Sequence, residues 1–282
     1  MRLLNVNGRA AIERDGRAVD VARASGGAYS SDLDLLYLDW DGFRAWESGY
    51  VGTDGDLFDA RSLGSPVTVP RQIFAVGLNY RSHAVETGLD LPDTPMIFTK
   101  FASAITGPNV TVTMPSDAVD WEAELVAVIG RRAEHVAAEN AWDFVAGLTV
   151  GQDLSERELQ VKPPAPQQFS LAKSFPGFAP LGPVLVSPDE FSDPGDLEIG
   201  CRVGSEVVQQ SRTGDLIFSV PVLVEYLSSI LPLLPGDVIF TGTPSGIGYA
   251  RDPQRYLSDG DDLTTWIEGI GSMTQRFVKP TP

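Results

Sequence analysis

The sequence predicts a strand-rich α+β fold with one large core and a small amino-terminal domain. The 28 glycines and 21 prolines are spread along the 282 residues as turn signals, a distribution typical of many short strands joined by turns. Hydrophobic residues make up 43% of the chain, which is enough for one large core. Several short segments alternate apolar residues at the period of a strand, whereas residues 220–231 carry an apolar face at helical spacing.

Residues 1–66 are predicted to form the small domain, of α/β type, and residues 67–282 the main domain. Asp15 and Gly16 separate two alternating segments and predict a hairpin. Ser31 is placed to cap a helix whose apolar stripe continues through Trp40 and Trp46, which we expect in the core. Turn signals at residues 63–66 mark the boundary, and no residue before it has a pattern typical of a catalytic site.

The main domain is predicted to consist mostly of buried strands. In chain order they cover residues 72–78, 97–100, 110–114, 119–130, 145–150 and 238–241, with an amphipathic helix over residues 137–144. Residues 87–96 are predicted to be a loop, and a loop in this position is able to close over a ligand, although ordinary surface loops are the commoner case.

Composition excludes several classes of partner. The formal net charge of −17 argues against nucleic acid and anionic membranes, because both are polyanions. An anionic substrate would therefore have to be held by a local cluster of cations. No segment reaches the ~18 consecutive apolar residues of a membrane span, and the first residues lack the apolar run of a signal peptide, so we expect a cytoplasmic protein. The single cysteine, Cys201, excludes an internal disulfide and is expected to be a small buried hydrophobe rather than a nucleophile.

Two glutamates in the segment 119–130 suggest a metal site. Glu122 and Glu124 share one face of the predicted strand, and both faces are otherwise apolar. Two adjacent buried carboxylates repel each other and cost several kcal/mol to desolvate, so a cation or a shared proton must accompany them. A hard divalent metal meets this need. The alternative is a glutamate pair at a strand end, solvated or paired with arginine.

A second acidic segment follows the strand predicted for residues 145–150. Asp153 lies at the strand end and is a candidate for a third oxygen ligand. Arg157 and Gln160 follow at helical spacing, and Arg157 is placed to grip a substrate carboxylate with two hydrogen bonds. The alternative is that Arg157 merely neutralises Glu156 or Asp153.

A candidate base precedes the predicted loop at residues 87–96. His83 and Glu86 lie three residues apart on one helical face, and a carboxylate in reach of an imidazole fixes its tautomer and raises its basicity. Such a pair is suited to activating water. The alternative is a surface ion pair, but the chain has two histidines in all, and His135 lies in a polar stretch that we expect to be exposed.

Two further segments have properties of an anion site. Lys173 stands among apolar residues, where a lysine either extends its ammonium to water or is held near an anion. The glycine-rich segment 242–248 follows a predicted strand and lacks the pattern of a Walker loop. It is able to offer backbone N–H groups and a hydroxyl to a carboxylate, or it is a plain tight turn.

The order and spacing of five motifs resemble the fumarylacetoacetate hydrolase family. From residue 77 onwards the chain carries G-L-N-Y-R-S-H-A-V-E, D-W-E-A-E-L-V-A-V-I-G, G-Q-D-L-S-E-R-E-L-Q, K-S-F-P-G-F-A-P-L-G-P and L-P-G-D-V-I-F-T-G-T-P-S-G-I-G. Residues 1–66 are similar to the variable amino-terminal extension of bacterial members. The resemblance implies the family's mixed β-sandwich roll and a homodimer. Gln152 departs from the family, which commonly has asparagine at this position.

The resemblance also implies roles for individual residues. Glu122, Glu124 and Asp153 would bind Mg2+ or Mn2+, with Ca2+ as a substitute in a crystal. His83 and Glu86 match the family's water-activating pair. The remaining matches are Lys173, for a developing oxyanion or enolate, and Tyr80, Arg157, Gln160 and Thr243, for substrate oxygens.

The implied activity is that of a metal-dependent hydrolase. It would cleave a carbon–carbon bond in an acylpyruvate or a related β-diketo or 2-oxo acid through a metal-stabilised enolate. A 2-oxo-acid decarboxylase acting on substrates such as oxaloacetate, or a 2-hydroxy-ene-dioate isomerase, would use the same site. An alternative from another class is a non-catalytic domain in which the metal only staples the fold. The expected partner is a small anionic 2-oxo or diketo acid.

Overall fold

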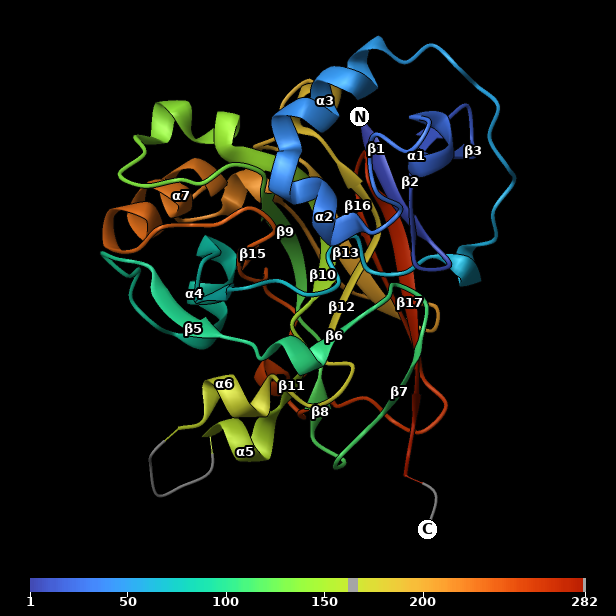
Figure 1. Cartoon of the computed structure of the whole chain (residues 1–282). Helices are drawn as coiled ribbons and strands as arrows, with labels where there is room; N and C mark the ends of the chain where they lie inside the picture. The colour runs from blue at the N-terminus through green and yellow to red at the C-terminus, as the bar shows by residue number, and fades with distance from the viewer. Residues whose placement is uncertain (162–166, 281–282) are drawn as a thin grey trace.

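Three β-sheets dominate the computed structural model, which describes residues 1–161 and 167–280 (Figure 1). The largest has ten strands: β1 (Arg2–Val6), β2 (Arg9–Arg14), β3 (Arg17–Asp20), β4 (Ile73–Gly77), β5 (Met96–Thr99), β6 (Ile105–Thr106), β9 (Ala123–Ile129), β10 (Val145–Gln152), β12 (Ala179–Val186) and β15 (Val238–Phe240). The second has five: β7 (Thr111–Thr113), β13 (Glu198–Val203), β14 (Glu206–Arg212), β16 (Asp262–Ile267) and β17 (Gly271–Val278). The third pairs β8 (Val119–Asp120) with β11 (Ser155–Glu156).

Short helices connect the strands. They are α1 (Val21–Ala24), α2 (Leu33–Leu36), α3 (Trp40–Gly49), α4 (Arg81–Thr87), α5 (Arg157–Val161), α6 (Phe169–Ala172) and α7 (Val220–Ile230). The helix predicted for residues 220–231 is confirmed as α7, with Pro221 in its first turn. The helix predicted for residues 137–144 is a 3₁₀ helix, η4 (Ala138–Phe144). These elements confirm the strand-rich α+β class.

The core lies where the two larger sheets pack against each other. The ten-stranded sheet runs β3-β2-β1-β12-β10-β9-β15-β4-β5, so β9 and β10 occupy its centre. Every residue of β9 and of β10 is buried, because neighbouring strands cover their edges and β13 and β16 of the second sheet contact one face. Side chains at the ends of these two strands are therefore shielded from water on several sides.

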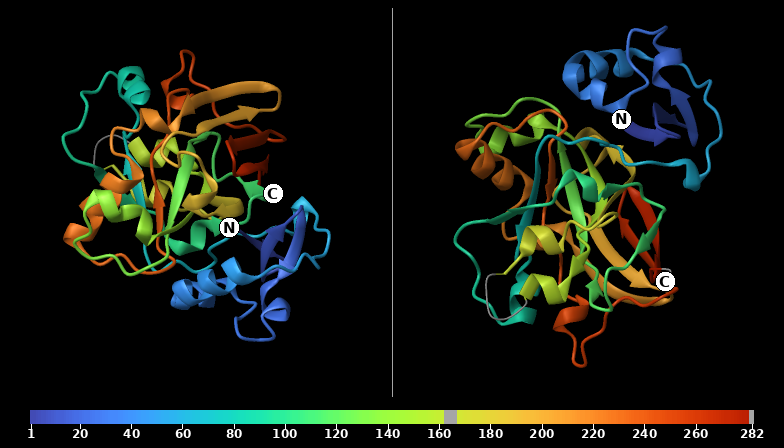
Figure 2. Two further views of the ribbon diagram at one scale, coloured as in Figure 1. Left: turned by 90° about the horizontal axis from the view of Figure 1, so that it is seen from above. Right: turned by 60° about the horizontal axis from the view of Figure 1, so that its bottom comes forward.

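The amino-terminal elements β1 to α3 form a lobe at one end of the molecule (Figure 2). The predicted hairpin is confirmed, since Asp15 and Gly16 connect β2 to β3 with positive φ angles of 48° and 73°. Strand β1 pairs with β12, with Leu3 opposite Leu185, and so extends the ten-stranded sheet. The division into residues 1–66 and 67–282 stays a prediction. No helix of the described residues is both long and apolar enough to cross a membrane.

The single strand predicted for residues 119–130 is interrupted at Trp121 and Glu122, which separate β8 from β9. Side chains replace the strand ladder at the break. The N–H of Trp121 donates to the carboxylate of Asp120, and the N–H of Glu122 donates to Oε1 of Gln152 at 2.8 Å. Gln152 therefore has a structural role, because it holds the backbone of Glu122 at the end of β10.

Candidate active site

Three carboxylates converge at the ends of the two central strands. Glu122 immediately precedes β9, Glu124 is the second residue of β9, and Asp153 follows β10. The antiparallel register places Gly151 opposite Glu124 and continues until the N–H of Asp153 donates to the carbonyl of Glu122 at 3.0 Å. One oxygen from each carboxylate lies within 4.8 Å of the others, and all three residues are buried. The structure thus brings the three predicted metal ligands together.

Two buried lysines contact this cluster. Lys173, at the end of α6, donates to Glu122 Oε2 at 2.7 Å and to Asp153 Oδ2 at 2.5 Å. Its ammonium is therefore held near anions, as one of the two sequence interpretations has it. Lys100, directly after β5, donates to Asp153 Oδ1 at 2.5 Å and is 2% exposed. Sequence reasoning missed Lys100, because a lysine at the end of a short strand is usually solvated.

The charges in the cluster do not balance. Burial, followed by the charges of Asp153 and Glu122, raises the pKa of Glu124 well above its ordinary value. Burial also opposes ionisation of Glu122, but Lys173, Arg157 and, to a smaller extent, His83 lower its pKa to about 2. The raised pKa favours the protonated form of Glu124, and a divalent ion would take the place of that proton. Three hard oxygen donors that gather around one point are the donor set that Mg2+ or Mn2+ prefers, so these residues fit a divalent ion.

Arg157, at the start of α5, faces the cluster from the other side. Its Nε donates to Asp120 Oδ2 at 2.8 Å, and its Nη1 donates to Gln160 Oε1 at 2.7 Å. Its Nη2 lies 2.8 Å from both Asp120 Oδ2 and Glu122 Oε1, but neither contact is aligned as a hydrogen bond. The sequence left open that Arg157 neutralises Glu156 or Asp153, but its partners are Asp120 and Glu122.

The predicted pairing of His83 with Glu86 is present. His83 Nδ1 lies 2.9 Å from Glu86 Oε2 on α4, and both side chains are largely buried. The other oxygen of Glu86 accepts from the N–H of Gly246 at 2.8 Å, so the helix is tied to the glycine-rich segment after β15. Because Glu86 occupies Nδ1, the proton-accepting nitrogen of a neutral His83 is Nε2.

Tyr80 and Thr243, two residues predicted to contact the substrate, are both buried. Tyr80 is fully buried, its pKa is raised by burial and by the charge of Glu124, and its hydroxyl has no hydrogen-bond partner among the described residues. Thr243 donates to the carbonyl of Ala123 at 2.9 Å and accepts from Gln209 at 2.8 Å. The hydroxyl of Tyr80 is thus free for a ligand, whereas that of Thr243 holds the edge of β9. Their contacts with substrate stay predictions.

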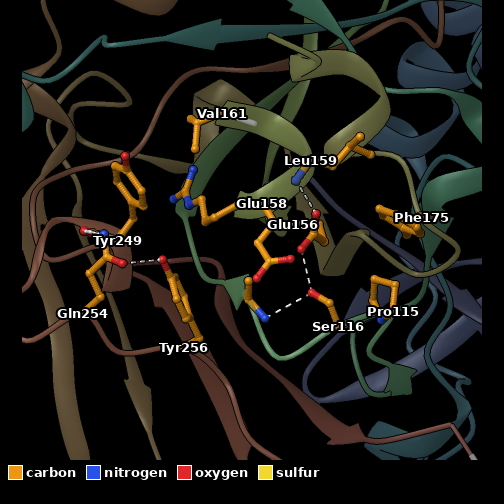
Figure 3. Close-up of a pocket in the computed structure, with 12 residues that line it drawn as sticks. Pro115, Ser116, Glu156, Glu158, Leu159, Val161, Phe175, Tyr249, Gln254 and Tyr256 are labelled. Atoms are coloured by element: carbon orange, nitrogen blue, oxygen red, sulfur yellow. Dashed lines mark hydrogen bonds between the residues drawn. The ribbon is translucent and has the colours of Figure 1, made fainter. Parts of the chain in front are cut away.

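A cavity of about 700 Å³ adjoins Arg157. Figure 3 shows Tyr249 and Tyr256 on one side of this cavity and Leu159 and Phe175 on the other. The Tyr249 ring centre lies 5.9 Å from the guanidinium carbon of Arg157, within reach of a cation–π contact. Arg157 therefore separates this aromatic cavity from the carboxylate cluster.

The family model for the fumarylacetoacetate (FAA) hydrolase C-terminal region matches residues 72–278, which include the whole of this site. The chain belongs to the fumarylacetoacetate hydrolase family. Human mitochondrial oxaloacetate tautomerase FAHD2A is 43% identical over 216 residues, which cover 76% of this chain and 68% of that protein. Because that relative is named as mitochondrial, the expected cytoplasmic location of this chain stays a prediction.

Solved structures of this family have the same fold. A putative HpcE protein from Mycobacterium smegmatis is 52% identical, with a TM-score of 0.95 and coverage of 100% of both chains. Maleylpyruvate hydrolase from Sphingobium sp. SYK-6, solved in complex with manganese(II) and pyruvate, is 27% identical, with a TM-score of 0.82 and coverage of 100% of both chains. Family membership supports an enzyme, and the reaction is a separate question.

Proposed function

We propose that this member of the family is a divalent-metal-dependent hydrolase of small acylpyruvates or related β-diketo acids. The observation that carries the proposal is the His83–Glu86 pair, at 2.9 Å, whose imidazole is close enough to the three converging carboxylates to lower the pKa of Glu122. Glu122, Glu124 and Asp153 would hold Mg2+ or Mn2+. When bound, such an ion polarises a 2-oxo group and offsets the negative charge of an enolate.

The chain's own residues supply the other steps. His83 Nε2 accepts a proton from a water molecule as that water attacks the distal carbonyl of the substrate, and Glu86 stabilises the imidazolium that results. The carbon–carbon bond then breaks, and its electron pair forms the enolate of the 2-oxo acid. Lys173 places a positive charge beside this enolate, and proton return from His83 to its carbon gives the second product. Arg157 and Gln160 orient the substrate carboxylate.

Keto–enol tautomerisation of oxaloacetate is the second candidate, because human oxaloacetate tautomerase FAHD2A is 43% identical over 216 residues. Here His83 would move a proton between the C3 carbon and the 2-oxo oxygen, without attack by water. Decarboxylation of oxaloacetate and isomerisation of ene-dioates would use the same enolate. In each case the substrate is small and anionic, and Arg157 and Lys173 would allow an acidic protein to hold it. We also propose that the chain acts as a homodimer, as the resemblance implies.

One set of assays separates these reactions. Purified protein with Mg2+ or Mn2+ is given acylpyruvates, fumarylpyruvate, oxaloacetate and 2,4-dioxo acids, and loss of enol absorbance, acid products and CO2 are followed. Hydrolysis releases pyruvate or another 2-oxo acid together with a second acid, whereas tautomerisation changes enol absorbance by interconverting the keto and enol forms of one acid and releases neither a second acid nor CO2. If a folded, metal-loaded sample converts none of these compounds, the proposal is wrong.

The two histidines offer a matched pair of variants. His83→Asn should lower the rate of hydrolysis about 100-fold or more, since general-base catalysis contributes that much. His135→Asn should leave the rate unchanged, because His135 is exposed and its φ of 52° suits asparagine. Lys173→Met tests the non-catalytic alternative. A domain in which the metal only staples the fold should keep its metal in this variant and lose no turnover, whereas the proposed enzyme should lose turnover.

A further inference from the structure

The carboxylate of Asp120 is fully buried, and both of its oxygens are engaged. Oδ1 accepts from the N–H groups of Trp121 and Gly248, each at 2.8 Å. Oδ2 accepts from the N–H of Tyr249 at 3.0 Å and from Arg157 Nε at 2.8 Å. One carboxylate thus joins the start of the interrupted strand, the segment after β15 and the guanidinium that faces the carboxylate cluster.

These contacts decide which edge of Arg157 is available. Asp120 accepts a hydrogen bond from Nε of the guanidinium, and Gln160 accepts one from Nη1. Nη2 is buried beside Glu122 and has no aligned acceptor among the described residues. Buried N–H donors without an acceptor are rare, and an oxygen of an anionic ligand would satisfy this one.

We propose that Asp120 is the positioning residue that makes Arg157 a carboxylate receptor, by holding the Nε side of the guanidinium so that its Nη edge faces a 2-oxo acid. This inference rests on the proposed function and assigns to Asp120 the orientation of the substrate carboxylate. Asp120 acts through Arg157 and does not itself touch the substrate.

The segment after β15 is shaped for this contact. A Cβ at Gly248 would lie 2.7 Å from Asp120 Oδ1 and would collide with the carbonyl oxygen of Arg255, so the close approach requires glycine. Gly246 of the same segment donates to Glu86 and accepts from the indole of Trp121 at 3.0 Å. Asp120 therefore anchors Arg157 to the segment that also holds the His83–Glu86 pair.

Asp120→Asn tests the proposal with almost no change in shape. The asparagine oxygen is able to keep the contacts of Oδ1 with Trp121 and Gly248, whereas its NH2 group would face Arg157 Nε and the N–H of Tyr249, donor against donor. We expect KM for the 2-oxo acid, and Kd for oxalate as a planar mimic of its enolate, to rise about tenfold to 100-fold, the range for a lost charge-assisted hydrogen bond. The value of kcat should change by less than about threefold, because His83, Glu86 and Lys173 are untouched. Oxalate binding by calorimetry in Mn2+ gives a readout that is independent of turnover.

A double-mutant cycle shows whether Asp120 acts through Arg157. In an Arg157→Met background, adding Asp120→Asn should alter oxalate affinity less than twofold, because the guanidinium that it positions is gone. Asp237→Asn is the matched control: Asp237 also accepts backbone N–H groups in the interior, from Gln72 and Leu234, but it lies outside the site.

The possible outcomes are distinct. Unchanged oxalate affinity in folded Asp120→Asn protein would overturn the proposal, and so would an equal loss in Asp237→Asn protein, which would indicate general destabilisation. Additive effects of the Asp120 and Arg157 changes would also overturn it. If the wild-type protein neither binds oxalate nor converts any 2-oxo acid, the proposed function itself has failed, and this result is distinguishable because it precedes any substitution.

Discussion

Ion pairs in the core and in the amino-terminal lobe have similar distances but different surroundings. In the core, Lys100–Asp153, Lys173–Glu122 and Arg157–Asp120 have N–O distances of 2.5, 2.7 and 2.8 Å, and no side chain among them is more than 9% exposed. In the lobe, Arg9–Asp20 and the pair between Arg23 and Asp56, which lies after α3 and bridges to Ala18 of β3, have distances of 2.7 and 3.0 Å, with side chains 19% to 80% exposed. The comparison teaches that burial, rather than distance, decides how much a pair matters.

Water explains the difference. An exposed pair gains little, because each partner is well solvated without the other, whereas a buried charge that loses its partner is left in a medium that solvates it poorly. The core set also holds four carboxyl groups, Asp120, Glu122, Glu124 and Asp153, against three cations, and the pKa of Glu124 is raised accordingly, so that this carboxyl favours its protonated form. The lobe pairs show no such excess. Each buried charge of the core set therefore depends on its partner, and one further cation would be stabilised by the acidic groups of the set.

Removing a buried cation should give the largest effect. Lys100→Met leaves the Oδ1 of Asp153 without its contact, and we expect a loss of about 3 kcal/mol in the free energy of unfolding, the lower range for breaking a buried pair. Urea denaturation in EDTA measures it. Lys279→Met is the control, because Lys279 pairs with Asp117 on the surface at 2.8 Å and should show no measurable change. Equal effects of the two variants would contradict the distinction between buried and exposed ion pairs.

Neutralising a carboxylate in the same cluster should not cost stability. Glu124→Gln replaces a carboxyl whose pKa is raised by burial and by the charges of Asp153 and Glu122, so its neutral form is already favoured and in EDTA this protein should be at least as stable as the wild type. It should also lose the stabilisation that a metal gives, which for the wild type is about 2.7 kcal/mol when the metal concentration is 100 times Kd. Thermal melts with EDTA and with Mn2+ measure both effects. Wild-type stabilisation by Mn2+ that persists in Glu124→Gln protein would argue against Glu124 as a ligand.

Part of this core was predictable from sequence because it depends on local patterns. Glu122 and Glu124 are two residues apart in the predicted strand, and Asp153 directly follows the next long strand, so their convergence follows once β9 and β10 pair. The same holds for His83 and Glu86, which one helical turn brings together. In each case short-range periodicity points the side chains in the same direction.

The rest could not be predicted because it depends on pairs far apart in the chain. Arg157 meets Asp120 across 37 residues, and Lys100 meets Asp153 across 53. Asp120 looked like an ordinary residue near the start of the strand predicted for residues 119–130, since nothing in its neighbourhood shows that the strand breaks after it. Only the pairing of β8 with β11 brings Asp120 beside Arg157. Local spacing suggested nearer partners and was a poor guide here.

The smallest expected effect belongs to the lobe. Arg9 lowers the pKa of Asp20 through its side-chain hydrogen bond, so this carboxylate stabilises the fold above its ordinary pKa of 3.8, and the contribution disappears as pH falls through the lowered value. In Arg9→Ala protein the pKa of Asp20 should rise toward the ordinary value, which a carboxyl NMR titration measures. The free energy of unfolding near neutral pH should be almost unchanged, because Asp20 keeps its hydrogen bond to the N–H of Arg23 at the start of α1. Any remaining difference should vanish in high salt, which screens exposed charges. A salt-resistant loss as large as that of Lys100→Met would show that exposure does not weaken this pair, and burial would no longer explain why the core pairs matter more.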